Sequence, residues 1–445
     1  MTTWKRNLLR LGRAADHGVL WIAVAVGLGA TRGKWRRRAA LRGLAGVTIC
    51  GVCGLPGADK SVVPFTSGPF GLPSGHAASA AAFATGVALE VPALAVPIGV
   101  LAATVGVSRV IAGERSPSQV AAGFAVGTAA GLATLRWWPR RPAVPASAAR
   151  PRRAAPACPD GAGLVLVVNR SAGAASDDFA ASLGKSLPAA EIVVAAAGDD
   201  LGALLRDAAA RAVILGVAGG DGTVRVAAAT ASDAGLPLLV IPAGTFNHFA
   251  ADLGVHSAAD ALAALRSGDA VLVDVACADG SAFVNTASTG VYVDLVRARE
   301  QLEPTFGKWP AMLIALVKVL RGGRPVDLLV DGRPRTVWLL FAGNCRYEPS
   351  GAAPGYRPDL ADGTLDVRLV DGGTPLARTR LVAAVLLGTL GRCRVYRTWQ
   401  ASALRVASAD GGPVQLCLDG EATRARPAIS LVKRPKQLLV YRPLT

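Results

Sequence analysis

Five uncharged, apolar stretches follow one another in the first third of the chain, and they constrain its fold more than any other feature. A helix needs about 20 mainly apolar residues to span a bilayer. The last stretch reaches this length, two others come close, and the first two are short. We therefore predict an all-α membrane domain, a helical bundle, over residues 1–137. The stretches cover residues 18–31, 43–58, 61–89, 91–108 and 116–135.

Basic residues flank these stretches and indicate an orientation. Residues 1–155 contain 19 Lys and Arg against four acidic residues, whereas the remainder contains 29 against 27, so the net charge of +17 belongs almost wholly to the N-terminal third. Charges interleaved with apolar runs argue against a nucleic-acid-binding protein. After five crossings, the basic loops near residues 32–42 and 136–153 both lie in the cytoplasm. We expect a multi-pass protein of the cytoplasmic membrane with its later domains in the cytoplasm.

The basic N-terminus disagrees with this orientation, because five crossings would place it outside. Residues 4–13 also have the pattern of an amphipathic helix lying on the bilayer. In that case the first apolar stretch does not span the membrane. The bias toward Ala, Gly, Arg and Pro is typical of a bacterium with GC-rich DNA.

The composition changes after a Pro/Ala/Arg-rich linker at residues 138–161, which we expect to contact anionic lipid headgroups. In residues 162–270, short apolar runs alternate with helical segments, which predicts an α/β doubly wound nucleotide domain. Residues 271–445 contain short strand-like runs with one helix at 302–320, which predicts an antiparallel β-sandwich domain. The strand-like runs that alternate with helices lie at 164–168, 192–195, 212–217 and 237–241.

A glycine-rich turn follows the strand at 212–217 and precedes a helix. Its glycines let the backbone approach a phosphate, and the helix N-terminus offers free N–H groups to an anion. An acid in such a loop repels phosphate, so it indicates a group that takes a proton from an attacking hydroxyl or acts through Mg²⁺. The turn reads Gly219-Gly220-Asp221-Gly222-Thr223.

Two similar turns follow neighbouring strands. One contains Gly244, Thr245 and Asn247, and the other begins at Asn169. Carboxyl ends of parallel strands are where doubly wound sheets bind ligands. Three such turns in one sheet predict a nucleotide site.

Residues from about 162 to 445 resemble the diacylglycerol kinase catalytic-domain family, which includes sphingosine and ceramide kinases. The resemblance rests on the 219–223 turn, the 242–249 run, the 359–366 run and Asp419-Gly420-Glu421. It implies a two-domain kinase with ATP in the cleft and Mg²⁺ as cofactor. The acceptor would be diacylglycerol or a related lipid alcohol of the membrane.

The resemblance also implies residue roles. Asp221 matches the acid proposed to activate the acceptor hydroxyl, and Glu421 matches an acid that acts through Mg²⁺ or as an alternative base. In bacterial lipid kinases a structural Mg²⁺ loop matches Asp359 and Thr364 through their backbone and Asp362 through its side chain. The nucleotide phosphates would be lined by Gly219, Gly220, Gly222, Thr223, Gly244, Thr245 and Asn247, with Asn169 on the nucleotide's other side.

Some positions depart from the family. Arg225 and Val226 stand where Asn and Glu are common, and His248 replaces an acid. A cation at position 225 either binds phosphate or is solvated. His248 indicates a different acceptor pocket, so the acceptor need not be diacylglycerol.

The membrane part carries its own phosphate-handling pattern. Basic and histidine side chains that meet at one membrane face suit a phosphate site. Residues 14–135 resemble the type 2 phosphatidic acid phosphatase family, most closely in residues 73–89. The matching residues are Lys60, Ser74, Gly75, His76, Ser108 and Arg109.

This second resemblance lacks a nucleophile. Aligning the Ser108-Arg109 motif puts Arg115 where the family has its nucleophilic histidine and Gln119 where it has an aspartate. A guanidinium stays protonated and cannot form a phosphoenzyme. We predict a degenerate phosphatase domain, kept as a membrane anchor or lipid-phosphate binder. The alternatives are a bifunctional lipid kinase and lipid phosphate phosphatase, and a nonenzymatic lipid- or nucleotide-binding membrane protein.

Overall fold

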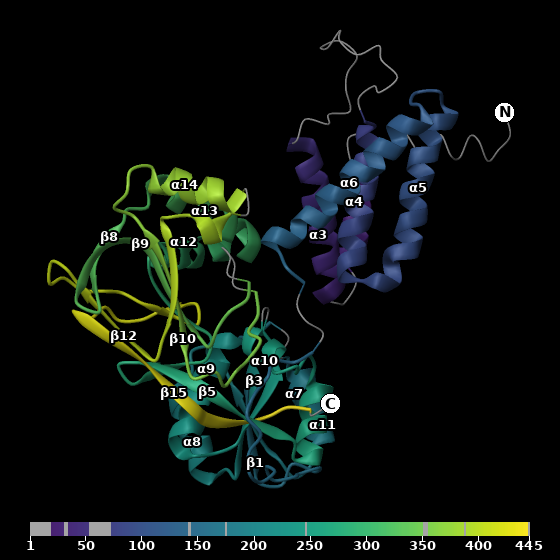
Figure 1. The fold of residues 1–445 in the computed structure, drawn as a ribbon. Helices are drawn as coiled ribbons and strands as arrows, with labels where there is room; N and C mark the ends of the chain where they lie inside the picture. The colour runs from purple at the N-terminus through teal and green to yellow at the C-terminus, as the bar shows by residue number, and fades with distance from the viewer. Residues whose placement is uncertain are drawn as a thin grey trace. The chain divides into compact units, whose positions relative to one another are not determined.

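The chain divides into two compact units, Met1–Arg141 and Pro142–Thr445 (Figure 1). In its described residues the first unit is helical, and the second is a mixed sheet with helices. This order of a helical region followed by an α/β domain confirms the predicted layout. The computed structural model describes residues 19–30, 34–52, 73–140, 144–173, 176–244, 247–349, 355–386 and 389–443.

The first unit is built around α4, an alanine-rich helix that packs against α3, α5 and α6. By length and composition, Pro92–Ile111 and Pro117–Trp137 are long and apolar enough to cross a membrane. Only 28% and 33% of their most apolar windows are buried in the bundle, as expected for helices that face lipid. The described helices are α2 (Val19–Ala30), α3 (Lys34–Val52), α4 (Gly75–Glu90), η2 (Pro92–Leu94), α5 (Ala95–Ile111) and α6 (Pro117–Trp137).

Three glycines one turn apart let α6 lie directly on α4. A Cβ atom at Gly127 would lie 2.0 Å from the Ala78 carbonyl oxygen, and one at Gly123 would lie 2.5 Å from the Ser74 carbonyl oxygen. At Gly131 it would meet the side chain of Thr85 at 2.7 Å. Small residues at this spacing are the usual way in which membrane helices approach closely.

A buried arginine ties three helices together at the other end of α4. Arg42 is fully buried; its Nε donates to Glu90 Oε1 at 2.6 Å and its Nη1 to Thr134 Oγ1 at 3.0 Å. Its Nη2 donates to the carbonyl of Trp138. Arg38 donates to the second Glu90 oxygen at 2.7 Å. Both oxygens of Glu90 are thus paired with arginines.

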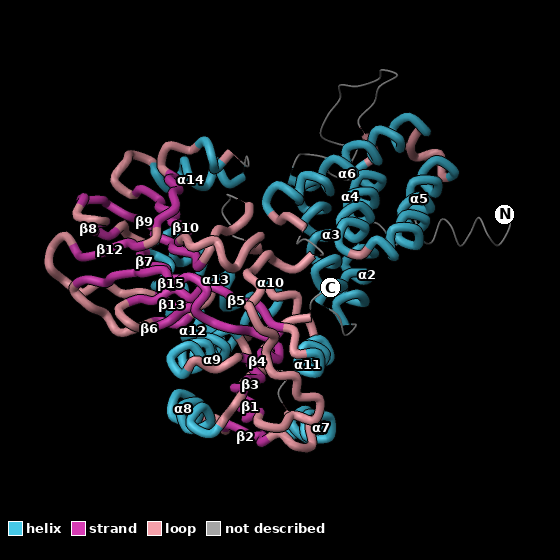
Figure 2. Tube along the Cα trace, turned by 60° about the horizontal axis from the view of Figure 1, so that its bottom comes forward, coloured by secondary structure: helices cyan, strands magenta, loops and turns pink. Residues whose placement is uncertain are grey.

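The second unit begins with a parallel sheet in the order β2-β1-β3-β4. Figure 2 shows α8 and α9 on one face of these strands and α7 and α11 on the other. This arrangement buries strands such as Leu164–Asn169 on both faces, which explains their continuous apolar runs. The elements are β1 (Leu164–Asn169), α7 (Asp177–Ser186), β2 (Glu191–Ala195), α8 (Leu201–Arg211), β3 (Ile214–Gly219), α9 (Asp221–Ala234), β4 (Leu238–Pro242), α10 (His248–Asp252) and α11 (Ala258–Ser267).

The β-rich part continues the same sheet through β15 (Ala428–Tyr441). This strand pairs antiparallel with β12 and β5, and near its end Val440 pairs parallel with Leu238 of β4. The two parts therefore share one mixed sheet. The other strands are β5 (Ala270–Ala278), β6 (Ser281–Phe283), β7 (Thr286–Gly290), β8 (Val326–Val330), β9 (Arg333–Asn344), β10 (Leu365–Asp371), β11 (Tyr396–Ala401), β12 (Ala403–Ser408), β13 (Cys417–Leu418) and β14 (Glu421–Ala422).

Two helical features of the β-rich part differ from the prediction. The single helix predicted at 302–320 is a pair, α12 (Val291–Phe306) and α13 (Lys308–Gly322), which separate at Gly307. Gly307 has φ +74°, a backbone conformation that ends a right-handed helix. The short helix α14 (Ala377–Leu386) has no counterpart in the prediction.

The segment after the first unit lies along the second. Ser147 forms a β-bridge with Asp359, and Ala149 forms one with Leu272. Cys158 N donates to the Leu265 carbonyl at 3.0 Å. Most of the stretch that the sequence marks as a linker is therefore extended chain that hydrogen-bonds to the second unit.

Candidate active site

The glycine turn between β3 and α9 leaves no room for side chains. A Cβ atom at Gly219 would lie 2.6 Å from Cβ of Thr223, and one at Gly244 would lie 2.4 Å from Cα of Gly220. Gly220 is the N-cap of α9 and has no side chain to cap it. The turns after β3 and β4 thus meet backbone to backbone, beside the free N–H groups of a helix N-terminus. This geometry is a cradle for a phosphate group.

Two asparagines hold the neighbouring turns in place. Asn247 has φ +52°, and its carboxamide accepts from Gly244 N at 2.9 Å and donates to Gly244 O at 2.7 Å. At the end of β1, Asn169 Nδ2 donates to Thr223 Oγ1 at 2.9 Å. The ends of β1, β3 and β4 are thereby brought together. The predicted phosphate-binding residue Thr245 lies outside the described residues.

Asp221 opens α9 at this junction and is half-buried. Its Oδ1 accepts two long hydrogen bonds of 3.4 Å, one from Phe249 N and one from Asn285 Nδ2. Asn285 belongs to the β-rich part, so both parts of the second unit contact this carboxylate. Long bonds orient a carboxylate while leaving it able to accept a proton.

Sequence reasoning missed a buried arginine that contacts Asn285. Arg357 is 1% exposed; its Nη2 donates to Asn285 Oδ1 at 3.0 Å and its Nε to Asp252 Oδ2 at 2.8 Å. Its guanidinium also lies over the ring of Phe249, 5.8 Å from the centroid. Arg357 therefore fixes Asn285, which in turn contacts Asp221. No motif marks Arg357, because its partners come from distant segments.

Glu421 reaches over the glycine turn from β14. A Cβ atom at Gly222 would lie 2.2 Å from Glu421 Oε1, so a side chain there would displace this carboxylate. Glu421 Oε2 pairs with Arg225 Nη2 at 2.6 Å. The sequence offered phosphate binding or solvation for Arg225; the structure shows a third arrangement, an ion pair with an acid of the predicted site. Because Glu421 is 54% exposed, this pair is screened by solvent.

Asp419 shapes the turn that carries Glu421. Its Oδ1 accepts from Asn285 N at 2.8 Å and Thr286 N at 2.7 Å, and its Oδ2 accepts from Val284 N at 3.0 Å. Burial raises the pKa of this carboxyl to about 6, against the three N–H donors, which favour the ionised form. Asp419 thus ties β14 to the segment that holds Asn285.

The predicted metal loop, residues 359–366, shares no residue with the glycine turn. Asp359 Oδ1 accepts from Ala361 N at 2.8 Å, and Asp362 Oδ1 accepts from Thr364 N at 2.9 Å. Asp362 Oδ2 accepts from Arg346 N at 2.7 Å. Both carboxylates therefore form short turns with their own loop, and Asp362 also joins the loop to the segment after β9.

Three of the predicted phosphatase residues lie at the N-terminus of α4, and Ser108 and Arg109 lie in the last turn of α5. Ser74 caps α4, accepting from Ala77 N at 3.4 Å, and its own N–H donates to the Gln119 carbonyl at 3.0 Å. Gly75 and His76 form the first turn of α4. Lys60 lies outside the described residues.

The second phosphatase motif is held by local bonds. Ser108 Oγ donates to the Val105 carbonyl at 2.7 Å, and Arg109 Nη1 pairs with Glu114 Oε2 at 2.7 Å. Gln119, which stands where the family has an aspartate, accepts from Ser116 N at 3.1 Å in a capping box. The helix-capping role of Gln119 accounts for its position.

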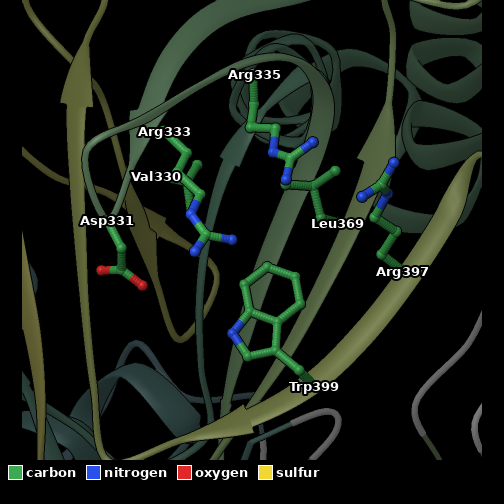
Figure 3. A pocket seen from close by; sticks show the side chains of 7 residues that line it. All are labelled: Val330, Asp331, Arg333, Arg335, Leu369, Arg397 and Trp399. Carbon is green, nitrogen blue, oxygen red and sulfur yellow. The ribbon is translucent and has the colours of Figure 1, made fainter.

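A hollow of about 440 Å³ opens in the β-rich part, lined by residues of β8 to β11 and the β8–β9 turn. The guanidinium groups of Arg333, Arg335 and Arg397 lie around it with the ring of Trp399 (Figure 3). Asp331 is tied to Arg405 N at 2.8 Å and turns away. No ion pair of the three arginines is found within the described part of the chain. The hollow shares no residue with the glycine turn.

Comparisons with known proteins agree with this division. The PAP2 superfamily model matches residues 44–143, and the model of the diacylglycerol kinase catalytic domain matches residues 163–278. No curated protein sequence matches the chain.

Solved structures match the second unit. A candidate diacylglycerol kinase from Bacillus anthracis strain Sterne is 20% identical, with a TM-score of 0.50, over 63% of this chain and 97% of that one. A second structure with the same description is 21% identical, with a TM-score of 0.48, over 63% and 96% of the two chains. The first likeness supports the fold assigned to the second unit.

Proposed function

Because the chain is a fusion of a PAP2 superfamily domain with a diacylglycerol kinase catalytic domain, we propose that it is a membrane-anchored, ATP-dependent lipid kinase. The acceptor is the hydroxyl of diacylglycerol or a related lipid alcohol. The observation that carries the proposal is Asp221, which stands at the edge of the glycine cradle and contacts the β-rich part through Asn285.

The residues of the cradle have distinct tasks in this reaction. Gly219, Gly220 and Gly244 let the backbone close around the phosphates, and the N–H groups at the start of α9 meet their charge. Asp221 takes the proton of the lipid hydroxyl while the hydroxyl oxygen forms a bond to the γ-phosphorus of ATP. The bond between that phosphorus and ADP breaks at the same time. Magnesium would neutralise the phosphate charge, and Glu421 is the acid that would hold it in exchange for its ion pair with Arg225.

The membrane part supports delivery of a lipid substrate. Its PAP2 match and the two apolar helices α5 and α6 suggest membrane association. We propose a multi-pass protein of a bacterial cytoplasmic membrane, with the kinase domain in the cytoplasm where ATP is available. Anionic lipid headgroups are further partners; the arginines around the hollow of Figure 3 offer one contact for them. Replacing Arg335 and Arg397 by Gln should weaken the stimulation of kinase activity by anionic lipid. Unchanged stimulation would contradict this contact.

The PAP2 domain acts in this proposal as an anchor without hydrolytic activity. The chain has four histidines, and His76 is the one in a phosphatase motif. Arg115 occupies the nucleophile's position, and no attack on phosphorus is open to a guanidinium. A bifunctional kinase and phosphatase would need a nucleophile that these motifs do not supply.

A second candidate function is nonenzymatic binding of nucleotide and lipid. The ion pair between Arg225 and Glu421 favours it, because a cation already neutralises one of the two acids of the predicted site. In this case Asp221→Asn alters ATP affinity while the wild type shows no turnover.

The deciding experiment supplies γ-labelled ATP and Mg²⁺ to the full-length protein with extracted membrane lipids. The wild type should form a labelled lipid whose identity names the acceptor, and Asp221→Ala should form none. Wild-type protein that is folded and binds ATP but labels no lipid would contradict the kinase and leave the binding function.

A further inference from the structure

A fully buried lysine lies inside the predicted metal loop. Both Lys433 and its partner Asp274 have side chains with 0% exposure. Lys433 enters from β15, a strand that no metal motif includes. Its Nζ lies 2.6 Å from Asn344 Oδ1, 2.9 Å from Cys345 Sγ, 3.2 Å from Asp274 Oδ2 and 3.9 Å from Asp362 Oδ1.

Two of the three ligands that the resemblance implies for a structural cation already contact other groups of the protein. Asp274, Cys345 and Asp362 converge within 4.8 Å, a spacing that suits a metal. However, Asp362 faces the ammonium of Lys433, and the Thr364 carbonyl accepts from Cys345 N at 3.0 Å. Of the ligands implied by the resemblance, these two therefore have protein partners.

The backbone also binds the two carboxylates. Gly363 N donates to Asp274 Oδ2 at 2.8 Å, and Lys436 N donates to Asp274 Oδ1 at 2.7 Å. Two N–H groups serve Asp362 in the same way. A carboxylate that is buried like Asp274, or largely so like Asp362, requires a compensating charge and hydrogen bonds, and here one ammonium and four N–H groups provide both.

A divalent ion does not fit beside this ammonium. Two cations a few ångströms apart in a buried site repel each other strongly. A divalent ion that displaced the Lys433 ammonium from these carboxylates would leave the ammonium charge buried without a partner. One atom of the loop, the buried Thr364 hydroxyl, has no hydrogen-bond partner among the described residues. A neutral hydroxyl is a weak replacement for the carboxylates that a divalent cation prefers.

We propose that the ammonium of Lys433 takes the place of the structural divalent cation, so that the 359–364 loop folds without metal. The consequence reaches the candidate active site. Asn344, held by Lys433, donates to the Val284 carbonyl at 3.0 Å, next to the Asn285 that contacts Asp221. Lys433 is thus a positioning residue at the base of the site. The proposal does not depend on kinase activity, because metal content and unfolding test it.

The test uses the full-length protein in detergent, without nucleotide, after dialysis against EDTA. Metal content is measured by elemental analysis, and apparent melting temperatures are compared in EDTA and in millimolar Mg²⁺. The variants are Lys433→Met, Asp362→Asn and, as a matched control, Lys436→Met. Lys436 is an exposed lysine of the same strand.

The wild type should keep no metal at this loop and melt within about 1 °C in the two buffers. Lys433→Met should melt about 10 °C lower in EDTA, because the buried carboxylate of Asp274 and the partly buried one of Asp362 lose their cation, and Mg²⁺ should restore part of this loss. Lys436→Met should melt like the wild type. A metal that persists in Asp362→Asn lies elsewhere and agrees with the proposal.

Two results would overturn it. One is a divalent ion that the wild type retains and Asp362→Asn loses. The other is wild-type protein that melts several degrees lower in EDTA and recovers in Mg²⁺. Both are read from proteins that keep Lys433, so they decide the question even where Lys433→Met fails to fold.

Discussion

The two units differ in how much of a phosphate-handling site each of them keeps. In the second unit, the glycine cradle and the acid beside it are both present, and Asp221 contacts both the nucleotide part, at Phe249, and the β-rich part, at Asn285. In the first unit, Ser74 caps α4, and we predict from the sequence that Arg115 replaces the nucleophile of the family. Residues that build a fold and residues that perform its chemistry can therefore change independently.

The contrast also shows what holds each framework together. In the first unit, Arg42 and Glu90 are buried as an ion pair, and Gly127 lets α6 lie on α4. None of these residues is part of the predicted phosphatase motifs. If the first unit is the membrane anchor that we propose, it needs this packing and does not need a nucleophile.

The largest effect should come from the acid of the cradle. Asp221→Asn keeps the size and the hydrogen-bond acceptor but cannot take a proton, so kcat should fall by about 10³-fold. Glu421→Gln should lower kcat less and shift the Mg²⁺ dependence. Steady-state kinetics with a purified lipid acceptor measure both, and Arg206→Gln on α8 is a distant control. A larger loss in Glu421→Gln than in Asp221→Asn would make Glu421 the base.

A second effect should appear in the stability of the first unit. Arg42→Met leaves Glu90 buried with less compensation, which should cost about 3 kcal/mol of stability. Arg36→Met, at an exposed arginine of the same helix, should cost little. Thermal unfolding in detergent measures both variants, and kinase activity at low temperature should persist in Arg42→Met. Equal melting of the two variants would show that the buried cluster does not hold the bundle.

The sequence predicts the glycine turns of the candidate site better than the buried basic side chains that hold the site in place. Glycine turns after short apolar strands follow local rules, so the meeting of Gly220 and Gly244 at one sheet edge is predictable from sequence. Arg357 and Lys433 are not, because their carboxylate and amide partners lie far away in the sequence. Asp252 and Asn285 precede Arg357 by 105 and 72 positions, and Asp274 and Asp362 precede Lys433 by 159 and 71. A lone basic residue in a strand gives no sign of whether it is solvated or buried.

The same limit applies to Arg225 and to the helix break at Gly307. Solvation and phosphate binding are both reasonable predictions for an arginine one turn into α9. The ion pair with Glu421 is not predictable, because Glu421 lies 196 residues later and only the fold brings the two together. The break between α12 and α13 rests on one glycine with positive φ, and many helices tolerate a glycine.

A smaller effect should follow from breaking the pair of Arg225 and Glu421. The half-exposed pair is worth about 1 kcal/mol or less. If Glu421 holds Mg²⁺, Arg225→Gln removes its competitor, and the Mg²⁺ concentration for half-maximal activity should fall by about 2- to 5-fold. Arg225→Lys keeps the charge and should behave like the wild type. An increase in the required Mg²⁺, or in KM for ATP alone, would instead assign Arg225 to phosphate binding.

The smallest effect should be found at the remnant of the phosphatase site, where we expect none. His76 is the motif histidine that remains, and in a phosphatase of this family it would protonate the leaving group. Without a nucleophile at position 115 there is no phosphoenzyme for it to serve. Release of phosphate from phosphatidate by the full-length protein should equal the rate without protein, and His76→Ala should not change it. Hydrolysis that His76→Ala abolishes would mean that another nucleophile serves this site, and the first unit would then be an enzyme rather than an anchor.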